Sequence, residues 1–146
     1  MDAIEKIHQI VDTNFDKEMD SWYYGPCDEV RALTEEFSDK NWRELIESTK
    51  LDKPDMWRVM LSHSFLDAEL SIGLSENLVT FLAAKCEDLD EAYLIVQYMD
   101  GFDWEQIPKW LLRLFDVKLN QMAANCRNEY KSYIIDIGRA VNEATI

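Results

Sequence analysis

The stretch LDEAYLIVQYM, residues 89–99, decides the fold class because its apolar side chains fall on nearly every face of a helix. A buried strand can have a similar composition, but no Gly/Pro hairpin signals flank a partner strand here. Asp88 or Asp90 is suited to cap the start of a helix, and the stretch DGFD, residues 100–103, breaks it. We therefore expect a central helix in this stretch.

The segments on either side repeat apolar residues at steps of three or four, which is the period of an amphipathic helix. The first such segment covers about residues 2–20, and the last covers about residues 130–141. Between them, helices are expected around the apolar groups within about residues 30–37, 42–46, 56–65 and 78–86.

Several residues mark where these helices begin. Pro26 and Pro54 each fit the first turn of a helix, where the missing N–H of proline costs nothing. Ser38 or Asp39 is a suitable N-cap for the helix that follows, and Asp52 is a suitable N-cap for the next one.

Two further breaks come from glycine and proline. Gly73 is expected to stop a helix. Pro108 would oppose the carbonyl of Trp104 inside a continuous helix, so we expect a short turn at 103–106 and a helix from near Ile107 to about residue 125.

These segments predict an all-α protein of about seven to eight helices joined by short connectors. Only four glycines and three prolines occur in 146 residues, and 47% of the residues are apolar, enough for a core. We expect one compact domain over residues 1–146, either a helical bundle or a short HEAT-like stack of antiparallel helical hairpins.

The sequence favours a cytoplasmic protein. It holds no apolar run near the ~18 residues of a membrane-spanning helix, and its first residues lack the basic and apolar regions of a secretory signal. Cys27, Cys86 and Cys126 are far apart and form no CxxC motif, so we expect no disulfide framework.

Candidate catalytic and metal-binding residues are few. His63 has Ser62, Ser64 and Asp67 nearby in sequence, but neighbours on one helix point apart and do not form a Ser/His/Asp triad. His8 with a carboxylate four residues later supplies only one pair of metal ligands. Motifs such as GxGxxG, GxSxG and HExxH are absent. We expect no enzyme activity, no bound metal and no cofactor.

The charge distribution carries most of the functional information. The net charge is −14, which disfavours nucleic acid and membranes as partners and favours a basic protein. Residues 1–39 hold eleven acids and three bases, and residues 86–108 hold seven acids and no base. Residues 109–146, by contrast, have a net charge of +2.

Aromatic residues lie among the acids in two places, DGFDW and the stretch around WYY. Exposed aromatics surrounded by charge resemble an interaction hot spot with a polar rim. The alternatives are that these aromatics pack into the core and that the acids only form a solvated surface. The expected partner-binding residues are Glu87, Asp88, Asp90, Glu91, Asp100, Phe102, Asp103, Trp104, Glu105, Trp22, Tyr23 and Tyr24.

The stretches CEDLDE (86–91) and DGFDWE (100–105) sit in a compact, acidic, helical chain without catalytic motifs. In these features the protein resembles bacterial immunity proteins of contact-dependent and other polymorphic toxin systems. The resemblance implies an inhibitor that is a monomer when free. It would block the active-site cleft of a basic toxin, such as a nuclease effector, with an acidic surface.

Two other functions stay open at this point. One is a DNA-mimic inhibitor of phage origin, which needs acids spaced like phosphates. The other is a helical adaptor or regulator that binds a peptide. Reversal of Asp100 and Asp103 to Lys is expected to weaken partner binding by more than about tenfold, and unchanged affinity would move the contact elsewhere, for example to residues 12–24.

Overall fold

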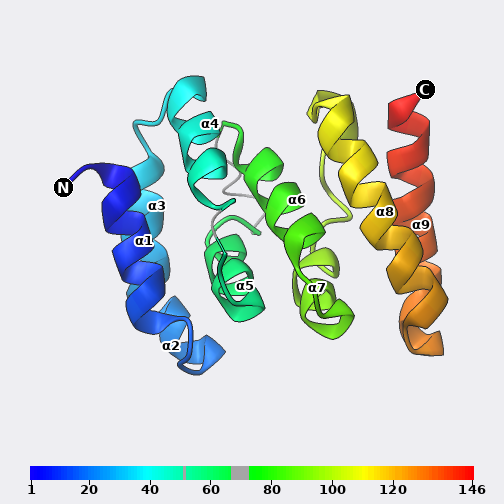
Figure 1. Ribbon diagram of the computed structural model, residues 1–146, viewed down its shortest axis with the longest axis horizontal. Helices are drawn as coiled ribbons and strands as arrows, with labels where there is room; N and C mark the ends of the chain where they lie inside the picture. The colour runs from blue at the N-terminus through cyan, green and yellow to red at the C-terminus, as the bar shows by residue number, and fades with distance from the viewer. Residues whose placement is uncertain (51, 67–72) are drawn as a thin grey trace.

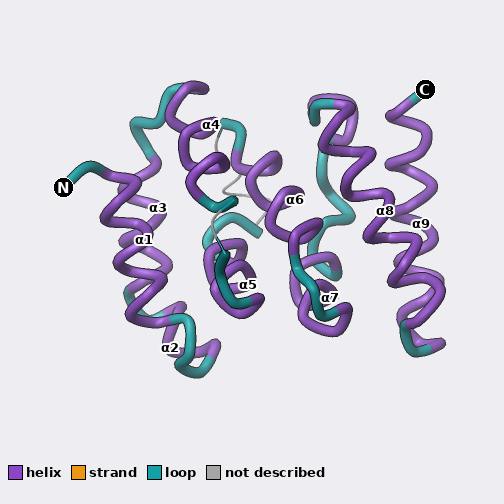
Figure 2. The backbone as a smooth tube through the Cα atoms, viewed as in Figure 1, coloured by secondary structure: helices purple, strands orange, loops and turns teal. Residues whose placement is uncertain are grey.

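The computed structural model describes residues 1–50, 52–66 and 73–146, and all regular secondary structure in these ranges is helical (Figure 2). The expected all-α class is therefore confirmed. In chain order the elements are α1 (Ala3–Asn14), α2 (Met19–Tyr23), α3 (Pro26–Thr34), α4 (Asp39–Ser48), α5 (Asp55–His63), α6 (Ser75–Lys85), α7 (Leu89–Val96), the 3₁₀ helix η2 (Trp104–Gln106), α8 (Lys109–Asn125) and α9 (Asn128–Thr145).

The helices lie in a row that runs from α1 at one end to α9 at the other (Figure 1). Helix α1 packs against α3, α5 packs against α6 and α7, and α8 packs against both α6 and α9. This succession of helical pairs matches the expected stack of hairpins. A single cluster of buried apolar side chains extends from Ile7 in α1 to Val141 in α9.

Several expected helix boundaries are confirmed. Pro26 stands in the first turn of α3. The Ser38 hydroxyl accepts a hydrogen bond from the backbone N–H of Asn41 and caps α4. The Asp88 carboxylate accepts from two backbone N–H groups and caps α7. The expected short turn is η2, and α8 begins just after it at Lys109.

The single helix expected over residues 2–20 is wrong, because α1 ends at Asn14 and α2 begins at Met19. The side chains of Thr13 and Asn14 both donate to backbone carbonyls four residues earlier, at 2.8 and 2.7 Å. Such bonds compete with continuation of a helix. The apolar spacing continues across the break because Phe15 and Met19 still pack against the core.

The expected start of the fourth helix is also wrong. Pro54, not Asp52, is the N-cap of α5, and Asp55 is the first helical residue. Pro54 has extended backbone angles, and the Asp55 carboxylate accepts a hydrogen bond from Arg58 at 3.0 Å, which closes the first turn.

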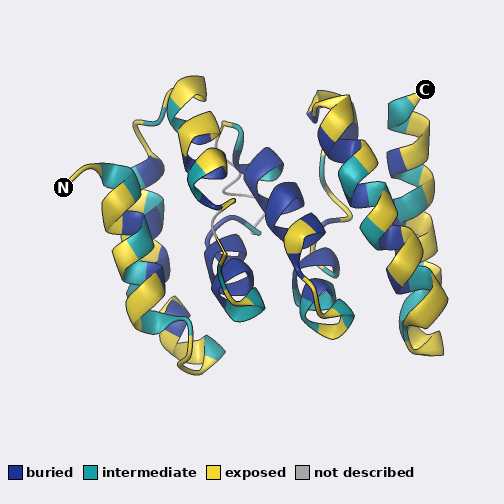
Figure 3. Cartoon of the chain, viewed as in Figure 1, coloured by how far each residue is buried: buried dark blue, intermediate teal, exposed yellow. Residues whose placement is uncertain are grey.

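The centre of the molecule is α5 and α6 rather than the 89–99 stretch. Nearly every residue of these two helices is buried (Figure 3). Helix α7 instead leaves Tyr93 and Leu94 partly exposed, and the next turn leaves Tyr98 50% exposed. The all-round apolar pattern of residues 89–99 therefore reflects a helix that is covered on only part of its surface.

Gly73 lies in the turn before α6, and its φ of +51° is in the left-handed region that favours glycine. A Cβ atom at this position would lie 2.8 Å from Nε1 of the fully buried Trp42. The turn therefore requires a residue without a side chain. A helix ending at Gly73 would consist of residues outside the described ranges.

Candidate interaction surface

The acidic group at residues 86–91 lies between the end of α6 and the first turn of α7. Asp55, at the start of α5, accepts hydrogen bonds from the backbone N–H groups of Glu87 at 2.9 Å and Asp88 at 2.8 Å. The ion pair between Asp55 and Arg58 is largely buried. Asp55 and the capping carboxylate of Asp88 thus fix the loop that leads into α7, so part of this acidic cluster stabilises the fold.

The other acids of this group differ in exposure. Glu91 is partly buried, and its carboxyl pKa is raised by burial and by the nearby charges of Asp55 and Asp88. Glu87 and Asp90 are exposed. These two carboxylates are the part of the group most accessible to a partner.

The acidic group at residues 100–105 surrounds aromatic residues that face inward. Trp104 is only 8% exposed and stacks on Phe115, with ring centroids 5.8 Å apart. Phe102 is partly buried and packs against Trp104 at 5.5 Å. The expectation that Trp104 is an exposed anchor is therefore wrong, because the tryptophan belongs to the core.

Asp100, Asp103 and Glu105 are exposed. The backbone N–H of Asp103 donates to a carboxylate oxygen of Glu76, in the first turn of α6, at 3.0 Å. Burial and the nearby charge of Asp100 raise the pKa of Tyr133 to about 12. The carboxylates of this group therefore stay on the surface although its aromatics do not.

The two acidic groups are separated by the length of α6. One follows the last residue of α6 at Lys85, and the other is bound to its first turn through Glu76. Eleven helical residues rise by about 15 Å. The two groups are therefore two separate patches and do not form one continuous surface.

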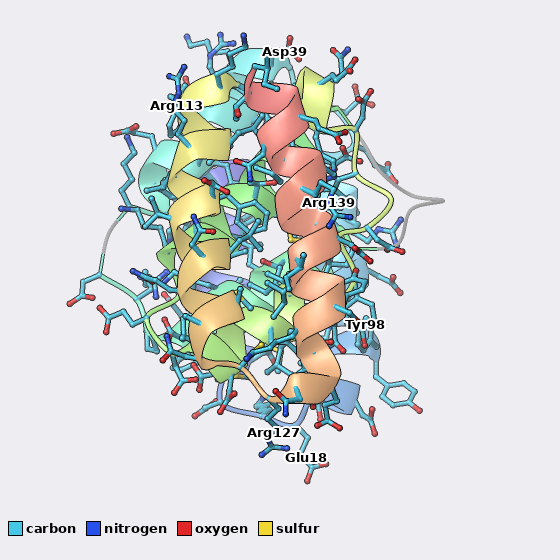
Figure 4. All side chains as sticks on the ribbon, turned by 90° about the vertical axis from the view of Figure 1, so that its right-hand side faces the viewer. Glu18, Asp39, Tyr98, Arg113, Arg127 and Arg139 are labelled. Carbon is cyan, nitrogen blue, oxygen red and sulfur yellow. The ribbon has the colours of Figure 1, made fainter. Side chains whose placement is uncertain are left out.

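The largest group of acids lies in residues 1–39, which form α1, α2, α3 and the first residue of α4 at one end of the row. All eleven acids of residues 1–39 are exposed. Within the described chain only one of them forms an ion pair, Asp12 with Lys53 at 3.3 Å. The opposite end of the row, α8 and α9, carries Arg113, Arg127 and Arg139 (Figure 4). The charge is therefore segregated along the long axis.

Helix α2 presents two tyrosines within this acidic end. Tyr23 is 48% exposed and Tyr24 is 87% exposed, and the acids Asp16, Glu18 and Asp20 precede them in sequence. Trp22 points the other way and is fully buried. The expectation that Trp22 is an exposed anchor is wrong, because Trp22 is the residue that attaches the short helix to the core.

Tyr23 is held by His63 at the end of α5. The Nε2 of His63 lies 3.1 Å from the carbonyl oxygen of Leu94, which can only accept, so Nε2 carries the proton. Nδ1 therefore accepts the hydrogen bond of the Tyr23 hydroxyl at 2.5 Å. Burial lowers the pKa of His63 and raises that of Tyr23 to about 12, so both side chains are neutral near pH 7.

Tyr98 completes this surface. Its ring lies 5.6 Å from that of His63 and nearly perpendicular to it, and Tyr23, His63 and Tyr98 line one shallow hollow. Figure 4 shows Tyr98 below the middle of the molecule and Glu18 at its lower end. We define the α2 face as the surface formed by Asp16, Glu18, Asp20, Tyr23, Tyr24, His63 and Tyr98.

Sequence reasoning missed the roles of His63 and Tyr98. Forty positions separate Tyr23 from His63, and no local spacing signals their contact. Of the residues near His63 in sequence, Ser62 and Ser64 are buried, and Asp67 lies outside the described residues.

The other candidate ligands have partners of their own. His8 Nε2 donates to the Ser48 hydroxyl at 2.8 Å, since that hydroxyl in turn donates to a backbone carbonyl. Asp12 accepts from the indole of Trp57 at 2.8 Å. The described residues hold no group of three or more His, Cys, Asp or Glu side chains suited to a metal ion.

All three cysteines are free thiols. Among the described helices, none has both the length and the apolar character needed to span a bilayer. Comparison of the chain with protein-family models, with curated proteins and with solved structures gives no match.

Proposed function

We propose that this protein is an immunity protein that neutralises a basic bacterial toxin by covering its active-site cleft. The observation that carries the proposal is the acidic end of the row. Residues 1–39 carry eleven exposed acids, with one ion pair among the described residues, and the same stretch carries two exposed tyrosines. The toxin would be a nuclease effector, whose cleft is basic because it binds phosphates.

The α2 face supplies both parts of a tight interface. Its carboxylates attract a basic cleft over long range and speed association. Tyr23, Tyr24 and Tyr98 supply large, rigid contact areas that slow dissociation once they are desolvated. The hydrogen bond to His63 fixes the position of Tyr23 before binding, so less side-chain entropy is lost.

The acidic groups at 86–91 and 100–105 are the alternative contacts. Their exposed members, such as Glu87, Asp90, Asp100 and Asp103, remain candidates for a second contact with the same partner. Trp104 is buried, so the exposed aromatic nearest to Asp100 is Tyr98, which the α2 face also includes. The α2 face adds the exposed Tyr23 and Tyr24 to it, and this difference is why we place the main contact there. The proposal also places the protein in the cytoplasm as a free monomer.

The decisive experiment asks whether a neighbouring gene encodes a toxin and, if it does, uses the toxin domain of that gene product. Co-expression with this protein should restore growth, and the purified pair should bind in calorimetry with an affinity that falls as salt rises. Growth inhibition that persists despite co-expression, together with no measurable binding, would refute the proposal. Equal binding to several unrelated DNA-binding proteins would favour the DNA-mimic alternative.

A further inference from the structure

A groove of about 370 Å³ lies between α4, the start of α6 and the start of α8. It is remote from the α2 face, since α2 is at the opposite end of the α1–α3 pair from α4 in Figure 1. Its volume is within the range of small-molecule sites, at the lower end. Its walls include Ile46, Trp110 and Leu111, so the interior is largely apolar.

Trp110 at the edge of this groove is 54% exposed. The other four tryptophans of the chain are between 0% and 8% exposed. A large aromatic side chain that stays in water forgoes the free energy that burial would supply. The ring of Trp110 is therefore accessible to a ligand in the groove, as the ring of a binding residue must be.

Asn77 provides an independent indication. Asn77 lines the groove and is only 9% exposed, and no hydrogen bond joins its amide to another described residue. Neither amide atom is among the fully buried polar atoms that lack a partner, so water reaches the amide through the groove. A ligand that displaces this water must offer the amide a polar atom in return.

The charge of the groove is opposite to that of the whole chain. Arg43, Lys50 and Glu47 line it, so its lining has a net charge of +1. Lys50 is paired with Glu47 at 2.8 Å, whereas Arg43 has no ion pair among the described residues. One unpaired guanidinium beside an apolar hollow is suited to a single carboxylate, which it can bind through two parallel hydrogen bonds.

We propose that this groove binds a small organic carboxylate, with an apolar body about the size of one aromatic ring. Arg43 binds the carboxylate, Trp110, Ile46 and Leu111 contact the apolar body, and the Asn77 amide pairs with a polar atom of the ligand. This site shares no residue with the α2 face, so the test of this proposal is independent of the test of the proposed toxin partner.

The test compares three probes that share one apolar body: 4-phenylbutyrate, 4-phenylbutanol and 4-phenylbutylamine. Binding to the full chain is followed by the intrinsic fluorescence of its five tryptophans, Trp110 among them, and by amide chemical shifts. We expect the carboxylate to bind about tenfold more tightly than the alcohol, and the amine to bind most weakly. The shift changes should be confined to α4, the start of α6 and the start of α8.

Two variants make the test specific. Arg43→Gln should abolish the preference for the carboxylate, whereas Arg139→Gln, which removes an exposed arginine from α9, should leave it unchanged. Asn77→Leu should weaken binding of the carboxylate probe, and its circular dichroism spectrum should match that of the unmodified protein. Equal affinity for the three probes, no binding at millimolar concentration, or equal effects of the two arginine variants would each overturn the proposal.

Discussion

The hydroxyl of Tyr23 donates a hydrogen bond of 2.5 Å to Nδ1 of His63, and this bond ties α2 to the end of α5. The other ring nitrogen of His63 binds the carbonyl of Leu94 in α7. One imidazole therefore connects three helices that are distant in sequence. The geometry of the α2 face depends on that connection.

Replacement Tyr23→Phe should lower the free energy of unfolding by about 1–2 kcal/mol, because it leaves the largely buried Nδ1 of His63 without a donor. Urea denaturation measures this effect. Tyr24→Phe is the matched control. Tyr24 is 87% exposed, so loss of its hydroxyl should change the free energy of unfolding by less than about 0.5 kcal/mol. Equal effects of the two variants would contradict the proposed role of the bond.

The stability of the protein should fall as the pH decreases from about 7.5 to 6. Burial lowers the pKa of His63, and burial also lowers that of His8. The unfolded chain therefore binds protons at a higher pH than the folded chain. The stabilisation is complete above the unfolded value near 6.5 and is lost as the pH falls from there towards the lowered folded values.

Urea denaturation across this pH range tests the linkage. His63→Gln and His8→Gln should each make the dependence shallower, because each removes one group that titrates. The raised carboxyl pKa of Glu91 acts in the opposite direction, and its effect begins at the ordinary value of 4.5, so a Glu91→Gln variant serves as the control for that group. A pH dependence that is unchanged in both histidine variants would show that other groups cause it.

The sequence predicts the helices well because their signals are local. Apolar spacing, the Ser38 cap, the Asp88 cap and Pro26 all act within a few residues of one another, and all of them hold in the structure. The break between α1 and α2 is missed for a related reason. Phe15 and Met19 reach the core on both sides of the break, so spacing alone looks continuous.

The candidate site is predicted less well because exposure is a property of the whole fold. Trp22 and Tyr23 are neighbours in sequence, yet one is fully buried and the other is half exposed. The contact of Tyr98 with His63 links α5 to the turn after α7. Composition can indicate that acids and aromatics gather, but only the packing of α2 decides which aromatics reach the surface.

Asp55→Ala should destabilise the fold by about 3 kcal/mol or more, because it leaves the buried charge of Arg58 without a carboxylate and with only the Lys53 carbonyl as acceptor. The backbone N–H groups of Glu87 and Asp88 lose their acceptor as well. Asp39→Ala is the control, since Asp39 also stands in the first turn of a helix but is exposed and should cost less than about 1 kcal/mol. A small effect of Asp55→Ala in thermal unfolding would mean that the α7 loop is held in another way.

The double replacement of Glu18 and Asp20 by Lys should weaken binding of the cognate toxin by more than about tenfold, mainly through slower association. Reversal of Asp136 and Glu143 on α9 changes the net charge equally at the opposite end and should have little effect. Stopped-flow association rates at low and high salt distinguish the effects of these two double variants. Reversal of Asp100 and Asp103 tests the other patch, and a larger loss there would move the main contact to residues 100–105.

Gly73→Ala should destabilise the protein by about 2 kcal/mol or more, since a non-glycine residue in the left-handed region costs about 1–2 kcal/mol and the new Cβ would also press on Trp42. Gly138 offers the matched comparison. It lies within α9, has a negative φ and has nothing within 4 Å of an added Cβ. Gly138→Ala should therefore stabilise the protein by about 0.5–1 kcal/mol through helix propensity. Chemical denaturation of both variants should show opposite signs, and a shared sign would mean that the close approach of Gly73 to Trp42 does not limit this turn.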